Sequence, residues 1–307
     1  MPPASSETHS LLSRGRAPEP RRVNFLGISN LVLFALAAAL IVVAALLGGI
    51  NRGWLFTPSP EPTEEYPEPL VVAPPNGAPT EAVIIFLHGL GGSSDGVSVA
   101  AKLIPLEGVR WIFPNAPSIP VAVTYNQPTP AWYNIEHFAE TLDDLWDDSE
   151  GIMRSTSYIA SMIKDLLAEG IPSEKIIVGG FSQGGAIALT TALHGAGVRL
   201  GGCFVLSSYL PMHNQYPVPL LAIEAKRTPV FIAHGTMDTV LPYSFGDITR
   251  QKLESFMDRG TVQFVGIPNM AHERLGAVET RLLSRWLMRV LESGGVSFGS
   301  GDARARR

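Results

Sequence analysis

Short apolar runs alternate with helix-like segments through most of the chain after residue 81. The runs contain four to six residues rich in Val, Ile and Phe, as buried parallel strands do, and lie at 82–87, 109–113, 175–179, 202–206, 230–233 and 262–265. Between them, apolar or Ala-rich segments at helical spacing predict helices at 151–170, 183–194, 243–257 and 275–291. The alternation predicts an α/β fold with a mostly parallel sheet flanked by helices. Ligands of such sheets bind beyond the carboxyl ends of the strands, so reactive side chains are expected there.

A different pattern precedes this body. Residues 31–50 form an uncharged apolar stretch, LVLFALAAALIVVAALLGGI. As a helix it would be about 30 Å long, the thickness of the hydrocarbon core of a membrane. It lacks the polar face that a helix on a globular core would have. We therefore predict a transmembrane helix. A cleaved signal peptide is the alternative, although its apolar region would be only about 7–15 residues long.

The flanks of this stretch predict the domain organisation. Residues 1–30 are expected to be a disordered basic N-terminus, 51–80 a Pro-rich extended linker, 81–293 the α/β body and 294–307 a flexible tail. The first 52 residues contain five arginines against two glutamates, a net charge of +3. Four of these arginines precede the apolar stretch, so the positive-inside rule predicts a single-pass membrane protein with a cytoplasmic N-terminus.

Charge and cysteine content exclude some functions. The net charge of −5 argues against nucleic acid as the main partner, because phosphate binding needs clustered cations. The single cysteine, Cys203, excludes an intramolecular disulfide and a multi-cysteine metal site. It lies in an apolar run and is expected to be a buried packing residue.

The strongest chemical signal is the pentapeptide from Gly180 to Gly184, GFSQG, between a predicted strand and a predicted helix. It fits G-x-S-x-G, in which a tight turn lifts a nucleophilic serine, here Ser182, above the sheet. The turn also sets the serine at a helix N-terminus, where developing negative charge is favoured. The alternative is a Gly-rich turn that contains an incidental serine.

Two further residues follow predicted strands later in the chain. Asp238 comes after 230–233 and could fix the tautomer of a histidine, whereas a turn-forming aspartate is the alternative. His272 comes after 262–265 and could be the base, whereas a helix-start or surface histidine is the alternative. The order Ser182, Asp238, His272 is that of the α/β-hydrolases. His88 and His234 each precede a glycine at a strand end, where a structural role is expected.

An acyl-transfer site of this fold also needs two backbone donors for the substrate oxygen. The first would be the N–H of Gln183, directly after the nucleophile. The second is expected from Leu90 in the Gly-rich loop HGLGG, where glycines allow close backbone approach. This loop matches neither phosphate-binding glycine motif, so it is not predicted to cradle a phosphate. The chemistry calls for no cofactor or metal.

With these residues assigned, the body resembles the acyl-protein thioesterase and lysophospholipase family of small serine hydrolases across residues 82–291. The resemblance rests on FLHGLGG (86–92), PNAP (114–117), AWYNI (131–135), GGFSQGGAIAL (179–189), LSSYLP (206–211), HGTMDTVLP (234–242) and NMAH (269–272). It implies Ser182, Asp238 and His272 as a catalytic triad and the Leu90 and Gln183 amides as an oxyanion hole. It also implies an acylated protein, a lysophospholipid or a small acyl ester as substrate.

The chain departs from the family pattern in three ways. Gly92 stands where the family usually has an aspartate, and the proline after Asp238 is shifted by one residue. Family members are typically soluble and cytosolic, whereas the predicted topology sends the body across the membrane. Protein S-acylation is chiefly a cytoplasmic-face modification, so the side on which the body lies stays open.

Other interpretations also stay open. Trp132 and Ile135 could line an acyl channel or could simply pack their loop. The body could be a general carboxylesterase with the same triad. It could also be a catalytically silent, membrane-tethered lipid-binding module.

Overall fold

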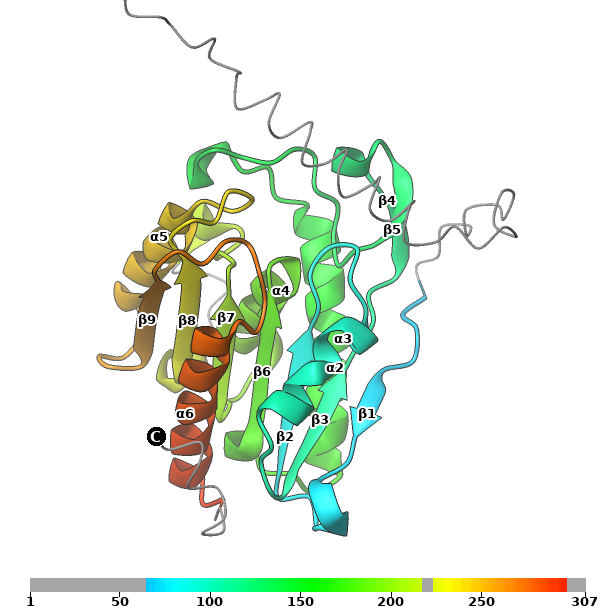
Figure 1. Ribbon diagram of the computed structural model, residues 1–307, viewed down its shortest axis with the longest axis vertical. Helices are drawn as coiled ribbons and strands as arrows, with labels where there is room; N and C mark the ends of the chain where they lie inside the picture. Colours follow the sequence, from blue (N-terminus) through cyan, green and yellow to red (C-terminus); the bar gives the residue numbers. More distant parts are fainter. Residues whose placement is uncertain (1–64, 217–222, 297–307) are drawn as a thin grey trace, which may run out of the picture. The chain divides into compact units, whose positions relative to one another are not determined.

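In the part of the chain that the structure describes, seven strands form one sheet in the order β1-β3-β2-β6-β7-β8-β9 (Figure 1). The computed structural model describes residues 65–216 and 223–296. The strands are β1 (Leu70–Val72), β2 (Ala82–Leu87), β3 (Val109–Phe113), β6 (Ile176–Phe181), β7 (Gly202–Leu206), β8 (Val230–Gly235) and β9 (Val262–Ile267). Neighbouring strands are parallel except β1, which runs antiparallel to β3. The carboxyl ends of the parallel strands therefore meet at one edge of the sheet.

Helices cover both faces of this sheet. They are α2 (Ser94–Leu103), α3 (Ser149–Ala168), α4 (Gln183–Thr190), α5 (Tyr243–Glu254) and α6 (Ala277–Ser293). In β2, Val83 and Ile85 belong to the core that includes buried residues of α3, α4 and α5. Ile84 and Phe86 belong to the core with α2 and α6, which lie in front of the sheet in Figure 1. The strands are apolar throughout because helices cover them on both sides.

The main elements agree with the sequence prediction, and the α/β fold with a mostly parallel sheet is confirmed. The predicted strand at 175–179 extends to Phe181, and the predicted helix at 183–194 divides into α4 and a π-helical turn, Thr191–Gly195. The hydrophobic pattern of the sequence did not predict α2. It also did not predict a separate hairpin, which is formed by β4 (Ser118–Val121) and β5 (Gln127–Pro130). The prolines in both hairpin strands obscure a strand pattern.

The sheet begins earlier than the sequence suggested. β1 lies inside the segment 51–80 that we expected to be linker, and it pairs with β3 from Leu70↔Phe113 to Val72↔Trp111. Three apolar residues among prolines are too short a run to distinguish a strand from a linker. An edge position tolerates such a strand, because only one of its sides needs hydrogen bonds.

Several expectations fall outside the described residues. These are the apolar stretch 31–50, the N-terminus 1–30, most of the linker, and residues 297–307 of the tail. Within 65–216 and 223–296, no helix combines the length and hydropathy that a membrane span requires. Cys203 is buried, as expected, and burial raises the pKa of its thiol.

Candidate active site

Ser182 occupies a strained turn between β6 and α4. Its φ of 53° and ψ of −126° lie in a region that residues other than glycine rarely adopt. The flanking glycines explain how the turn forms. A Cβ on Gly180 would lie 2.3 Å from the carbonyl carbon of Gly184, and one on Gly184 would lie 2.4 Å from the carbonyl oxygen of His88. The strand and the helix thus meet backbone to backbone, and the G-x-S-x-G spacing follows from this contact.

The three residues singled out in the sequence form a hydrogen-bonded series with His272 in the middle. The Oγ of Ser182 is 3.0 Å from Nε2 of His272, and Nδ1 of His272 is 2.7 Å from Oδ2 of Asp238. With Asp238 ionised, Nδ1–H donates to the carboxylate and Nε2 accepts a hydrogen bond from the serine hydroxyl. Ser182, Asp238 and His272 follow β6, β8 and β9, so the sheet edge brings together residues that are far apart in sequence.

Asp238 is held as a carboxylate. Burial alone would raise its pKa. Opposing contacts outweigh burial and hold the pKa well below its usual value. They are hydrogen bonds from His234 and His272, the charge of His272 and the backbone N–H of Leu241. Oδ1 accepts the N–H groups of Val240 (2.9 Å) and Leu241 (2.8 Å). Oδ2 faces Nε2 of His234 at 3.4 Å in addition to His272. These donors fix both oxygens, so the carboxylate can orient the imidazole.

The two expected oxyanion donors belong to the turn of Ser182 and to the loop that packs on this turn. Gln183 is the first residue of α4, so its N–H has no acceptor within the helix. The loop after β2 packs on the turn, since a Cβ on Gly89 would lie 3.1 Å from Cβ of Ser182. The N–H of Gly91 donates to Pro130 and that of Gly92 to Gly89, whereas the N–H of Leu90 donates to no acceptor within the described residues. Both amides are therefore available to a substrate oxygen.

The side chain of Gln183 holds the neighbouring loop in place. Its Oε1 accepts the backbone N–H of Trp132 at 2.9 Å, and its Nε2 donates to the carbonyl of Tyr133 at 2.7 Å. The Trp132 indole N–H donates to the carbonyl of His88 at 2.7 Å. Trp132 is only 1% exposed, so it braces the loop of His88 from inside the protein and does not form an open wall. Ile135 is partly buried and packs with Leu90 against the small apolar cluster of Ile119, Val121 and Ala131.

The two competing histidines have structural partners, as expected. Nε2 of His88 accepts the N–H of Ala116 at 3.1 Å, and its Nδ1 lies 2.7 Å from the carbonyl of Gly89. Burial lowers the pKa of His88, which keeps this ring neutral. His234 lies 2.9 Å from the carbonyl of Leu241 as well as near Asp238. Sequence reasoning missed this second contact, and it also missed Ser208, whose hydroxyl donates to the carbonyl of Ser182 at 2.6 Å.

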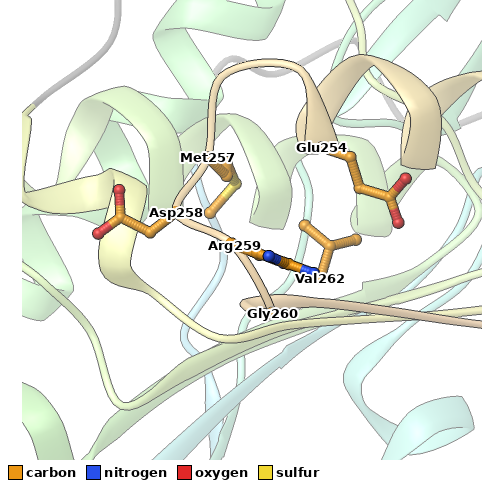
Figure 2. Close-up of a pocket in the computed structure, with 6 residues that line it drawn as sticks. All are labelled: Glu254, Met257, Asp258, Arg259, Gly260 and Val262. Carbon is orange, nitrogen blue, oxygen red and sulfur yellow. The ribbon is translucent and has the colours of Figure 1, made fainter.

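A hollow of about 380 Å³ lies away from these residues, between the end of α5 and the start of β9 (Figure 2). It is lined by Glu254, Met257, Asp258, Arg259, Gly260 and Val262. The amino end of β9 borders the hollow, whereas His272 follows its carboxyl end. We assign the hollow no part in the chemistry.

The fold and the arrangement at its sheet edge define an α/β-hydrolase. The sequence model of the phospholipase/carboxylesterase family matches residues 68–281, and the chain belongs to this family. A protein of Mycosarcoma maydis named acyl-protein thioesterase 1 is 37% identical over 238 residues, which cover 72% of this chain and 96% of that protein. A Schizosaccharomyces pombe protein of the same name is 41% identical over 173 residues, covering 56% of this chain and 75% of that protein.

Solved structures agree with the fold. The crystal structure of Zea mays acyl-protein thioesterase 2 superposes with a TM-score of 0.63 at 29% identity, covering 74% of this chain and all of that one. The crystal structure of Arabidopsis thaliana SOBER1 gives a TM-score of 0.64 at 26% identity, covering 68% of this chain and 99% of that one. The structural likeness covers essentially the whole of both solved structures and about 70% of this chain.

Proposed function

We propose that this chain is a serine hydrolase that cleaves fatty-acyl thioesters and esters, with acylated proteins or lysophospholipids as substrates. The hydrogen-bonded series Ser182–His272–Asp238 carries this proposal. Membership of the phospholipase/carboxylesterase family supports it, as do the relatives named acyl-protein thioesterase. The reaction needs no cofactor, because the nucleophile, the base and the oxyanion donors all come from the chain.

In the acylation step, Nε2 of His272 removes the proton from Ser182 as Oγ attacks the acyl carbonyl. The carbonyl oxygen becomes an anion and accepts the N–H groups of Leu90 and Gln183. Preorganised donors of this kind lower the barrier because they need no reorientation as the charge develops. The tetrahedral intermediate collapses, the carbon–sulfur or carbon–oxygen bond breaks, and the His272 proton passes to the departing thiol or alcohol.

In the deacylation step, water replaces the leaving group. His272 removes a proton from this water, which attacks the carbonyl of the acyl-serine. The second tetrahedral intermediate expels Oγ of Ser182, which takes back the proton from His272. The fatty acid leaves and the enzyme returns to its starting state. Asp238 stabilises the imidazolium in both steps and stays ionised throughout.

The test replaces the nucleophile in the full-length protein, purified in detergent. Ser182→Ala should abolish hydrolysis of a palmitoylated peptide thioester, of lysophosphatidylcholine and of p-nitrophenyl butyrate, and the variant should stay folded. Ser161→Ala, which changes an exposed serine of α3, should behave as the parent does. Undiminished turnover by Ser182→Ala would overturn the assignment.

The same panel separates the proposal from its rivals. A general carboxylesterase would hydrolyse the short ester far faster than the long-chain thioester or the lysophospholipid. A lipid-binding module without activity would hydrolyse none of the three and would not react with a fluorophosphonate probe. Comparable or faster turnover of the long-chain substrates supports the proposed function.

We also propose that residues 31–50 anchor the enzyme as a single-pass membrane protein with a cytoplasmic N-terminus. The uncharged length of this stretch and the arginines before it support this topology. The full chain should remain in the membrane pellet after alkaline carbonate extraction. Protease added to the cytoplasmic face of sealed vesicles should spare the body, and digestion of the body from that face would contradict the proposed orientation.

A further inference from the structure

Tyr66 precedes β1 and lies before the segment that matches the family, which begins at residue 68. Its ring stacks on Tyr158 of α3, with centroids 3.8 Å apart and planes 15° from parallel. It also stacks more loosely against Trp132, at 6.3 Å and 25°. The chain that leads into the catalytic body is thus held in place by aromatic contacts next to the loop that contains Trp132.

A hydrogen-bond series connects Tyr66 to that loop. The Tyr66 hydroxyl lies 2.9 Å from Oγ of Ser155, and the Ser155 hydroxyl donates to the carbonyl of Trp132. A serine hydroxyl has a single hydrogen, so with that hydrogen given to Trp132 the Tyr66 O–H must be the donor to Ser155. Ser155 is fully buried, where a hydroxyl oxygen that accepts no hydrogen bond would be unfavourable. Tyr66 therefore completes the hydrogen bonding of a buried group that holds Trp132.

Trp132 in turn contacts both sides of the proposed oxyanion hole. Its backbone N–H donates to the side chain of Gln183, whose own backbone N–H is one proposed donor. Its indole N–H donates to the carbonyl of His88, two residues before Leu90, the other proposed donor. A shift of Trp132 would therefore disturb a contact that supports each donor.

We propose that Tyr66 is a positioning residue, which holds the two oxyanion donors in catalytic geometry through Ser155 and Trp132. The inference rests on the proposed function, because it concerns the rate of the same acyl transfer. It makes the segment that joins the body to the N-terminal region part of the catalytic support. A chain cut after Tyr66 would keep the family fold but lose this support.

The test compares full-length Tyr66→Ala, Tyr66→Phe and Ser155→Ala with Tyr125→Ala, whose tyrosine is 91% exposed. Active sites are counted with a fluorophosphonate, and kcat and KM are measured with p-nitrophenyl butyrate. For Tyr66→Ala we expect kcat per active site to fall about tenfold, less than the ~10²–10³ that follows removal of an oxyanion donor. Tyr66→Phe keeps the stacked ring but loses the hydroxyl donor, and kcat should fall about threefold. KM should not change, because oxyanion donors act mainly on the transition state and not on the bound substrate.

A second readout distinguishes positioning from simple stabilisation. An alkyl boronic acid forms a tetrahedral adduct with the serine and uses the same donors, so its inhibition constant should rise in proportion to the fall in kcat. A purely structural role would lower the melting temperature and leave kcat per active site and boronate affinity unchanged, which would overturn the inference. If Tyr66→Ala does not fold, Tyr66→Phe and Ser155→Ala decide the question by the same two measurements. Activity in Ser182→Ala would instead overturn the proposed function itself.

Discussion

Glu279 of α6 is fully buried close to the loop that contains His272, and its raised pKa should lower the free energy of unfolding as pH rises from 4.5 to about 8. Its Oε2 accepts the N–H of Leu275 at 2.7 Å, and Oε1 has no hydrogen-bond partner within the described residues. Burial raises the pKa to about 8 from the usual 4.5, and the nearby Glu273 adds to the effect. Below pH 4.5 the carboxyl is protonated in both folded and unfolded chains. Between 4.5 and about 8 only the unfolded chain loses the proton, so the free energy of unfolding falls as pH rises through this range.

The size of the effect follows from these two pKa values. The interval from 4.5 to about 8, at about 1.4 kcal/mol per pH unit, amounts to about 5 kcal/mol as an upper limit. Glu279→Gln cannot ionise and should escape this loss. Its Oε can still accept the Leu275 N–H, but its amide N–H groups lack partners, so at pH 5 it should be about 1 kcal/mol less stable than the parent.

The assay is urea unfolding of the full-length protein in detergent from pH 5 to pH 9. The free energy of unfolding of Glu279→Gln should move from below the parent at pH 5 to above it at pH 9. Glu107→Gln, which changes an exposed glutamate, should follow the parent at every pH. Parallel pH profiles for Glu279→Gln and the parent would refute the reasoning, because they would show that burial does not keep Glu279 protonated.

Two further substitutions test the geometry around Ser182, and an alkylation experiment tests the burial of Cys203. Gly184→Ala would bring a Cβ within 2.4 Å of the His88 carbonyl oxygen, so it should lower the melting temperature sharply or prevent folding. The control is Gly276→Ala, whose Cβ would have no neighbouring atom nearer than 3.8 Å and which should have little effect. Asp238→Asn should keep the fold but lower kcat about ten-thousandfold, as the equivalent change does in a serine protease, and a decrease of less than tenfold would contradict its role. Cys203 should resist iodoacetamide in the native protein at pH 8 and react once urea unfolds it, because burial raises the pKa of its thiol and shields it. Rapid native alkylation would contradict this burial.

The sequence predicted the structure best at positions where sterics or chemistry require one residue type. Gly180 and Gly184 are required by backbone contacts of under 3 Å, so the turn of Ser182 is visible as a motif. Asp238 and His272 follow apolar strands, and a parallel sheet brings such positions to one edge. The parallel strands of the sheet and the proximity of the three side chains could thus be predicted before any coordinates.

The supporting contacts could not be predicted in the same way. The link from Tyr66 to Ser155 spans 89 positions, and that from Ser208 to Ser182 spans 26, with no spacing rule to mark either. The sequence predicted that Trp132 lies near the active site. That its side chain is buried follows only from the structure, in which α3 packs against its loop. β1 was not predicted, because three residues are too few to show the apolar pattern of a strand. Its pairing with β3 is visible only in the structure.

The central claim is that Ser182 carries the acyl group during turnover. The most direct measurement mixes the full-length enzyme with a palmitoyl thioester, quenches the reaction in acid within milliseconds to seconds, and maps the acyl group by peptide mass spectrometry. We predict palmitate on the peptide that contains Ser182, lost again on the time scale of turnover, and no acylated peptide from Ser182→Ala. Acylation at another residue, or turnover by Ser182→Ala at the parental rate, would contradict the account.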